Sequence, residues 1–314
     1  MANQLRSERK KKKKRWWKRI GVFFLFVLIA GGAYAYSVYH SLNKAIETIH
    51  EPIERVKSGK REEELKLEKK EPFSVLLLGV DERKNDSGRS DTMIVLTVNP
   101  NEPSVQMVSI PRDTRTLIVG KGVKDKINHA YAFGGVDMAI ATVENFLDIP
   151  IDYYIQVNME GFKDIVDAVD GVTVQNDFSF TYGGVHFPKG EITLNGEEAL
   201  LYSRMRKQDP RGDFGRQDRQ QKIIQGVIKK GASISSLWNY GDIFNAISKN
   251  VKTNMSFEEM VEIQKNYREA GKHIDRHQIS GSGKTINSVW YLIVSDEEKE
   301  RVQTLLKKHL ELND

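Results

Sequence analysis

One stretch without a charged side chain, residues 20–39, limits what this chain can fold into. It is about as long as the ~20 residues with which a helix crosses a bilayer. Trp16 and Trp17 precede it, and Tyr34, Tyr36 and Tyr39 lie toward its end, as in the aromatic belts of membrane helices. The pattern predicts a transmembrane signal anchor at residues 20–39.

The charge distribution predicts how this segment is oriented. Residues 1–19 hold ten Lys and Arg against Glu8, a local +9, whereas the whole chain carries +5, so the remainder sums to −4. Positive flanks stay in the cytoplasm, so we expect a single-pass type II protein of the cell membrane, with residues 40–314 outside. The basic tail suits anionic lipid headgroups, and the acidic remainder excludes a nucleic-acid partner.

The apolar stretch has one alternative interpretation, and the segment after it has an interpretation of its own. Ala33-Tyr34-Ala35 is compatible with a signal-peptidase site, which would make the apolar stretch a removable signal peptide. Residues 40–71 are dense in charge and are interpreted as a juxtamembrane helix or stalk without a packed core. The chain has no cysteine, which excludes disulfides, thiolate zinc sites and cysteine nucleophiles.

Residues 72–314 alternate between strand and helix patterns. Short apolar runs at 74–80, 92–98 and 105–110 are typical of buried strands, and further strands are expected near 152–157, 172–176 and 288–294. Helical periodicity covers 136–147, 162–169, 196–205, 216–230, 241–249, 257–270 and 297–312, and residues 177–195 suggest a hairpin. We therefore predict a single α/β domain, a three-layer α/β/α sandwich with a mainly parallel or mixed central sheet.

A cationic segment at residues 202–221 is the first candidate site. Arg204, Arg206, Arg211, Arg216 and Arg219 crowd a helix–loop–helix passage. Arginine suits phosphate because its planar donors stay charged. Arg216 and Gln220 continue the stripe of Ile223 and Val227, so both should point inward near a helix N-terminus, where anions are favoured. The alternative is a solvated surface loop with local Arg–Asp pairs.

Acidic residues at strand ends are the second candidate site. Asp81 ends the first strand, Asp91 opens the second, and Arg112 and Asp113 follow the third. Ligands of α/β sheets bind where strands end, and Mg²⁺ takes one or two carboxylates together with phosphate oxygens. A surface ion pair of Asp91 with Arg89 is the alternative. No Walker loop, dinucleotide fingerprint or nucleophile elbow is present, so phosphoryl transfer by positioning and charge neutralisation fits best.

Five motifs resemble the LytR-CpsA-Psr family. They are VLLLGVDER (75–83), GRSDTM (88–93), VSIPRDT (108–114), KINHAY (126–131) and YSRMRKQDPRGDFGRQDRQ (202–220). The resemblance implies an enzyme that transfers an anionic glycopolymer, most closely wall teichoic acid, from undecaprenyl pyrophosphate to a muramic acid hydroxyl of peptidoglycan. A phosphodiester forms and undecaprenyl phosphate is released.

The resemblance also implies residue roles. Asp81 and Asp91 would hold Mg²⁺, with Mn²⁺ as a possible substitute, and Asp113 would orient Arg112. The implied pyrophosphate contacts are Arg83, Arg112, Lys126, Arg204, Arg206, Arg216, Arg219 and Gln220. The general base stays open, with an aspartate beside the metal as one hypothesis. The apolar faces of helices 136–147 and 162–169 could line a lipid channel, although plain core is the commoner use of such faces.

Two other functions stay open on sequence alone. Hydrolysis of the lipid diphosphate would use the same metal and arginines with water as acceptor. A membrane-anchored regulator or attenuator is the other class, but only about 19 residues would face the cytoplasm. The polymer that is transferred is also left open by the motifs.

Overall fold

The computed structural model describes residues 40, 47–53, 55, 57–81, 88–233 and 249–312. The predicted anchor at 20–39, the basic tail, Arg83 and nearly all of the helix expected at 241–249 lie outside the described residues. Within the described ranges, no helix has the length and apolar character of a membrane span. The chain divides into two units, residues 1–44 and 45–314, and only the second is described below.

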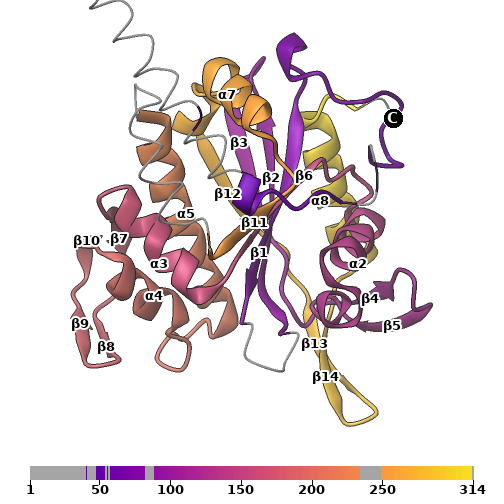
Figure 1. The fold of residues 1–314 in the computed structure, drawn as a ribbon. Coiled ribbons are helices and arrows are strands. Elements are labelled where there is room, and N and C mark those ends of the chain that lie inside the picture. The colour runs from indigo at the N-terminus through magenta and orange to yellow at the C-terminus, as the bar shows by residue number, and fades with distance from the viewer. Residues whose placement is uncertain are drawn as a thin grey trace, which may run out of the picture. The chain divides into compact units, whose positions relative to one another are not determined.

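The core of the fold is a six-stranded mixed sheet with the order β11-β6-β1-β2-β3-β12 (Figure 1). Its strands are β1 (Phe73–Val80), β2 (Ser90–Asn99), β3 (Ser104–Ser109), β6 (Tyr153–Val157), β11 (Val251–Thr253) and β12 (Ile274–Gln278). β1 is parallel to β6 and antiparallel to β2, while β3 is antiparallel to β2 and parallel to β12. The predicted α/β fold with a mixed sheet is confirmed.

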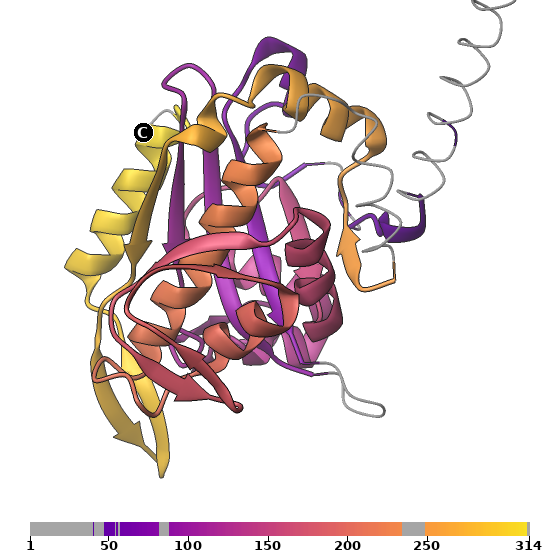
Figure 2. The same cartoon turned by 90° about the vertical axis from the view of Figure 1, so that its left-hand side faces the viewer.

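Both faces of the sheet are covered, which gives three layers (Figure 2). Alternate residues of β1 divide between the two cores: Leu76 and Leu78 face α2 and α8, whereas Phe73 and Val75 face the side of α5 and α7. The helices are α2 (His129–Leu147), α3 (Met159–Ala168), α4 (Gly196–Arg204), α5 (Asp213–Ser233), α7 (Phe257–Asn266) and α8 (Asp296–His309).

A smaller subdomain is built around α3, α4 and part of α5. Its strands are β7 (Val172–Asn176), β8 (Phe180–Tyr182), β9 (Val185–Phe187) and β10 (Gly190–Leu194), and Tyr202 and Ile223 are fully buried in its core. β8 and β9 form the hairpin expected within 177–195. Two more hairpins, β4 (Arg115–Ile118) with β5 (Val123–Lys126) and β13 (Ser282–Ile286) with β14 (Val289–Ile293), flank the sheet.

The apolar residues of α2 that could have lined a lipid channel are core. Ala139, Ile140 and Val143 are at most 2% exposed and pack against the sheet. The helix is longer than predicted because its first turn begins at His129, and Gly134 and Gly135 interrupt its helical dihedral angles. Gly135 has φ +62°, a conformation that glycine adopts without steric cost.

The described residues between 47 and 72, here called the N-terminal strap, pack on the domain, so the expectation of a stalk without packed residues is wrong. Ile49 and Leu67 are buried, and Leu67 joins the cluster of Phe73 and Val75. A short 3-10 helix, η1 (Leu67–Lys69), positions Leu67. The charge density of this segment misled the prediction, because its arginines are paired with the domain.

Candidate functional site

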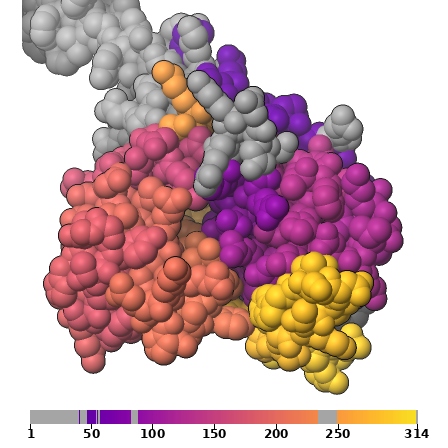
Figure 3. All heavy atoms as spheres, turned by 90° about the horizontal axis from the view of Figure 1, so that it is seen from below, coloured from indigo at the N-terminus to yellow at the C-terminus, as the bar shows by residue number. Residues whose placement is uncertain are grey.

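The predicted site residues gather at one end of the sheet. β1, β3, β6 and β12 all finish at this end, and β2 starts there, as their registers require. The start of α5 reaches the same end, where the Gln278 side chain donates to the Phe214 carbonyl. Figure 3 views this end, which is hollowed between the α4–α5 part and the β1–β3 and α2 part.

Asp91 occupies a β-bulge, the sheet irregularity that places an extra residue in one strand. Gly79 pairs with Thr92 and Val80 pairs with Ser90, so Asp91 has no partner in the β1–β2 ladder. A bulge re-aims the side chain of the extra residue. Here the carboxylate accepts a hydrogen bond from Arg112 Nη1 at 2.9 Å. The partner of Asp91 is therefore Arg112, and not Arg89 as in the alternative of a surface ion pair.

Asp113 connects two of the predicted cations. Its carboxylate accepts from Lys126 Nζ at 2.6 Å and lies 3.6 Å from Arg112 Nε. The main chain fixes this geometry, because the Ile127 and Asn128 N–H groups donate to the Thr114 and Arg112 carbonyls. Asp113 thus lies within ion-pair distance of both Arg112 and Lys126.

Helix α5 adds Arg216 from its first turn. The helix begins at Asp213, three residues earlier than expected, and Arg216 Nη2 lies 2.9 Å from Asp213 Oδ1. The Arg216 side chain is 12% exposed, so its inward orientation is confirmed. Gln220 is half-buried one turn later. Sequence reasoning missed Asp213, although its i,i+3 spacing from Arg216 was a usable signal.

Arg204 and Arg206 lie at the edge of the group. Arg206 Nε is 3.7 Å from Asp213 Oδ1, and its side chain is half exposed. Arg204 is the exposed last residue of α4. Arg206 thus borders the group through Asp213, and Arg204 lies two residues before it on the surface.

The electrostatics of this group favour an anionic ligand. Burial lowers the pKa of Arg216, Asp213 opposes this, and the charges of Arg112 and Arg206 lower it further. Burial also lowers the pKa of Arg112, but Asp91, Asp213 and Asp113 together raise it above its usual value. The guanidinium groups of Arg112, Arg206 and Arg216 thus share carboxylates whose negative charge does not fully compensate their positive charge and burial.

Unsatisfied buried polar atoms mark the same place. Among the described residues, every buried side-chain nitrogen or oxygen without a hydrogen-bond partner belongs to this end of the domain or to the adjoining β4 and α2. They lie in Ser90, Ser109, Thr114, Arg115, Asn128, Asp213, Arg216 and Gln217. Because buried polar groups in proteins are normally bonded, such a cluster offers hydrogen-bonding positions to water or to a polar ligand.

Arg219 has a different role from the one expected. It is 2% exposed, and its guanidinium donates to the carbonyls of Tyr202 and Met205 and to the carboxylate of Asp209. Its donors are used inside the protein, where they tie α5 to the end of α4. The structure therefore separates Arg219 from the pyrophosphate contacts implied by the resemblance.

The two predicted magnesium ligands lie at the ends of neighbouring strands. Asp81 directly follows β1, its N–H donates to the Arg89 carbonyl, and Asp91 is partly exposed at the start of β2. Two carboxylates with neighbouring phosphate oxygens and water suffice for Mg²⁺. No group of three or more potential ligands occurs in the described ranges, so a metal cage made only of protein side chains is not indicated there.

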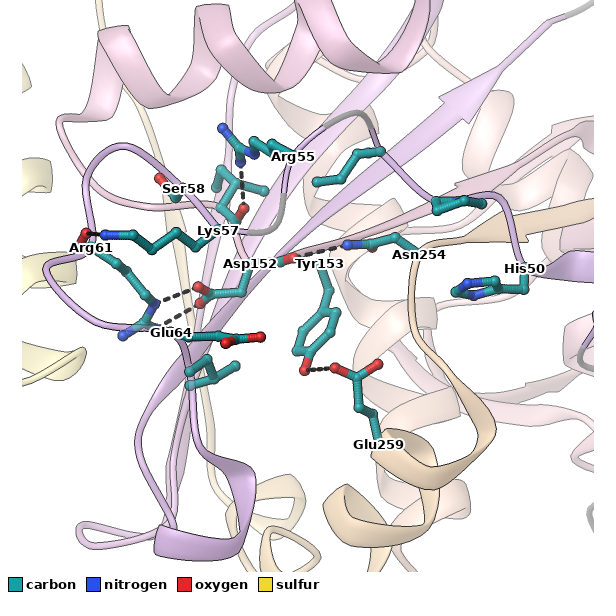
Figure 4. Close-up of a pocket in the computed structure, with 14 residues that line it drawn as sticks. His50, Arg55, Lys57, Ser58, Arg61, Glu64, Asp152, Tyr153, Asn254 and Glu259 are labelled. Carbon is teal, nitrogen blue, oxygen red and sulfur yellow. Dashed lines mark hydrogen bonds and ion pairs between the residues drawn. The ribbon is translucent and has the colours of Figure 1, made fainter.

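A separate polar pocket of about 220 Å³ lies at the opposite end of β6, against the N-terminal strap (Figure 4). Its charged groups bind each other: Arg61 pairs with Asp152, and the Tyr153 hydroxyl donates to Glu259. Arg55 also donates to the Ile151 carbonyl there. Because these groups are paired internally, we interpret the pocket as the seat of the strap.

The fold and this site define a mixed-sheet α/β protein with an arginine-lined anion site at its strand ends. The chain belongs to the LytR_cpsA_psr family, whose model matches residues 36–308.

Relatives and solved structures agree with this assignment. Over 287 residues the chain is 56% identical to the polyisoprenyl-teichoic acid–peptidoglycan teichoic acid transferase TagU of Bacillus mycoides, covering 91% of this chain and 94% of that one. It is 52% identical over 311 residues to TagU of Bacillus subtilis, with 99% and 100% covered. A structure of TagT bound to LIIa-WTA aligns with a TM-score of 0.73 at 33% identity, covering 84% of this chain and 100% of that one.

Proposed function

We propose that this protein transfers wall teichoic acid from an undecaprenyl-pyrophosphate carrier to peptidoglycan. The observation that carries the proposal is a cluster of four cations, Arg112, Lys126, Arg206 and Arg216, around three carboxylates, Asp91, Asp113 and Asp213. In addition, the buried Nε of Arg216 has no hydrogen-bond partner within the domain. A pyrophosphate offers the oxygens that this cluster lacks. The relatives named as teichoic acid transferases supply the identity of the polymer and the acceptor.

In the proposed reaction the acceptor hydroxyl oxygen attacks the phosphorus that carries the glycopolymer. The bond from this phosphorus to the bridging oxygen breaks, a phosphodiester to the acceptor forms, and undecaprenyl phosphate leaves. Arg112, Lys126 and Arg216 hold the pyrophosphate and neutralise the charge that develops on the leaving group. A carboxylate near Arg112 receives the acceptor proton, and Asp81 and Asp91 are the candidates.

Asp81 and Asp91 would also hold Mg²⁺. When bound, the ion would neutralise phosphate charge and fix the orientation of the two phosphates. What supports this assignment is the pair of hard oxygen ligands on adjacent strand ends.

A membrane location completes the proposal. The uncharged stretch at 20–39 and the basic block before it support a single-pass anchor with the catalytic domain outside the cell. A lipid-linked donor resides in the same membrane, so the anchor would keep enzyme and donor together.

The test uses the full-length protein in lipid nanodiscs with a lipid-pyrophosphate-linked glycopolymer and peptidoglycan. We expect polymer to become covalently attached to the wall, and we expect chelation to stop transfer until Mg²⁺ or Mn²⁺ is restored. Arg216→Ala and Asp91→Ala should each lower the rate by at least about 100-fold, because each removes a charge at the reacting phosphates. Arg301→Ala, which alters an exposed arginine paired with Glu298 on α8, is the matched control.

Three outcomes would contradict the proposal. Near-normal transfer by both site variants would remove the site assignment. Release of glycan phosphate without attachment to the wall would favour hydrolysis. Absence of any turnover by the wild-type protein would favour the regulator alternative.

A further inference from the structure

A two-stranded hairpin projects from the same end of the molecule as the candidate site. β13 and β14 pair antiparallel from Ser282–Ile293 to Ile286–Val289. Figure 1 shows the hairpin projecting past the end of the central sheet, and in Figure 3 the C-terminal part of the chain borders the hollow. Its turn residues Asn287 and Ser288 both have positive φ, 49° and 65°. This is the two-residue turn that matches the natural twist of a hairpin, so the projection is well formed.

Trp290 makes a flat surface on one face of this hairpin. Its side chain is 48% exposed, the largest exposed aromatic surface among the described residues. The indole lies against Gly283 on the neighbouring strand: a Cβ at Gly283 would be 2.9 Å from indole Nε1 and 3.1 Å from Cζ2. Glycine at this position therefore leaves the space that the indole occupies, and the rest of the ring faces solvent.

The other face of the hairpin is fixed to the rim of the site. The Tyr291 hydroxyl donates to Asp125 at 3.2 Å, and the Arg115 guanidinium lies 5.6 Å from the centre of the Tyr291 ring. The Leu292 N–H donates to the carbonyl of Asp113, the residue that binds Arg112 and Lys126. Since two strand residues span about 7 Å, the backbone of Trp290 lies about that far along β14 from the hydrogen bond to Asp113, in a register that the hairpin fixes.

The chemistry around Trp290 suits a sugar ring better than a membrane. Thr285 is the cross-strand neighbour of Trp290, and the turn residues Asn287 and Ser288 are exposed and polar. The exposed apolar Val289 and the cation Lys284 lie on the opposite face, so the indole stands without an apolar neighbour on its own face of the tip, unlike a tip that enters a bilayer. A pyranose has an apolar C–H face that stacks on an aromatic ring and hydroxyl groups at its edge that bond to polar side chains. A rigid indole with one free face among polar residues provides both.

The distribution of charge separates this surface from the one expected for the donor. The loop from Met205 to Gly212 presents Arg206, Lys207 and Arg211 on the other side of the hollow, where an anionic polymer would be held. The hairpin carries a single cation, Lys284. The less charged of the two substrates therefore matches the tryptophan side.

We infer that the β13–β14 hairpin is the docking element for the acceptor, and that Trp290 stacks on a sugar of the peptidoglycan glycan strand. This inference rests on the proposed function. It assigns the acceptor to the tryptophan side of the hollow and the anionic donor to the arginine-rich side.

The experiment measures transfer by full-length protein in nanodiscs while acceptor and donor concentrations are varied separately. For Trp290→Ala we expect the KM for peptidoglycan to rise about tenfold, because one aromatic contact is lost. The KM for the lipid-linked donor should stay unchanged. Trp290→Phe should restore most of the affinity. Gly283→Ala should weaken acceptor binding as well, because the added methyl group displaces the indole.

Val289→Ala is the matched control, because Val289 is a neighbouring exposed residue on the opposite face of the same strand. An unchanged KM for peptidoglycan in Trp290→Phe and Trp290→Ala would overturn the inference while transfer by the wild type stands. A raised KM for the donor alone would assign the hairpin to the polymer and also overturn it. Failure of the wild type to transfer would instead reject the proposed function.

Discussion

Arg216 is held where burial and two neighbouring guanidinium groups oppose its charge. Its pKa is lowered by burial and by Arg112 and Arg206, and Asp213 offsets only part of this. Arginine nevertheless stays protonated in proteins. The positive charge therefore destabilises the ligand-free protein locally, as expected for a group that a ligand is meant to complete.

This imbalance gives a prediction about stability. Arg216→Met should raise the free energy of unfolding by about 1 kcal/mol while abolishing transfer, because an apolar side chain of similar length removes a buried charge whose cost its ion pair with Asp213 offsets only in part. Asp213 keeps its hydrogen bond from Gln217 at 3.2 Å in the variant. Denaturant titration measures the change. Addition of inorganic pyrophosphate with Mg²⁺ should raise the Tm of the wild type and not that of the variant.

Arg216 and Arg219 show where sequence reasoning about single residues stops. The inward phase of Arg216 followed from its spacing to Ile223, and the structure confirms it. Arg219 shares the motif but is buried on another side of α5, where it bonds to main-chain carbonyls. Helical periodicity identifies buried residues when a helix buries a single face. Because α5 packs on both the central sheet and the smaller subdomain, periodicity does not tell the site residue Arg216 from the structural residue Arg219.

The connection between α4 and α5 is stabilised by an internal ion pair. Asp209 is buried against Arg219, and a Cβ on Gly215 would overlap its carboxylate, so Gly215 leaves the space for it. Burial raises the pKa of Asp209, but hydrogen bonds from Arg219 and from the Arg211 N–H outweigh this and lower it. The loop that carries Arg206 is thereby held in place.

Asp209→Asn should destabilise the protein by about 3 kcal/mol, because it leaves the Arg219 charge buried without a counter-ion. The folded-state pKa of Asp209 is depressed, so its contribution is complete above about pH 4 and disappears as pH falls through the folded-state value. Thermal unfolding between pH 7 and pH 3 should show a shallower acid loss in the variant. The double variant Asp209→Asn, Arg219→Met should recover part of the stability; a further loss would contradict the pairing.

Element boundaries followed from sequence where the apolar pattern was strong. The strand expected at 172–176 is β7. The first three predicted strands are β1, β2 and β3, which lie side by side in the sheet. β12 was not predicted, because Ile274–Gln278 is a polar edge strand whose partner, β3, is far away in sequence. The juxtaposition of Asp91 with Arg112 was foreseeable from adjacent strand ends, whereas the bulge that aims Asp91 was not.

The strap fastens the end of the domain that lies away from the candidate site. Arg55 donates to Glu144 at 2.6 and 2.9 Å, and Glu144 also accepts from the Ser58 hydroxyl and the Ile151 N–H. His50 pairs with Thr253 of β11 in a parallel bridge. The strap thus joins α2, β6 and β11 at the end of the sheet away from the site.

Glu144→Gln should release the strap without disturbing the distant site. The neutral amide weakens the pair with Arg55 and leaves one acceptor oxygen for four donor groups, so we expect a destabilisation of about 2 kcal/mol. Trypsin should then cut more rapidly after Lys57 and Lys60, while the KM values for transfer stay near those of the wild type. Unchanged cleavage would show that the strap is held mainly by Ile49 and Leu67.

The strap also determines how mechanical tension would travel through the protein. Force applied to the chain before residue 47 reaches the His50–Thr253 bridge and the arginine clamps before it reaches the central strands. These fastenings sit at the opposite end of the sheet from Asp91 and Arg112. If the chain is anchored through residues 20–39 as proposed, a pull on the anchor would load these fastenings first and leave the reaction centre undistorted.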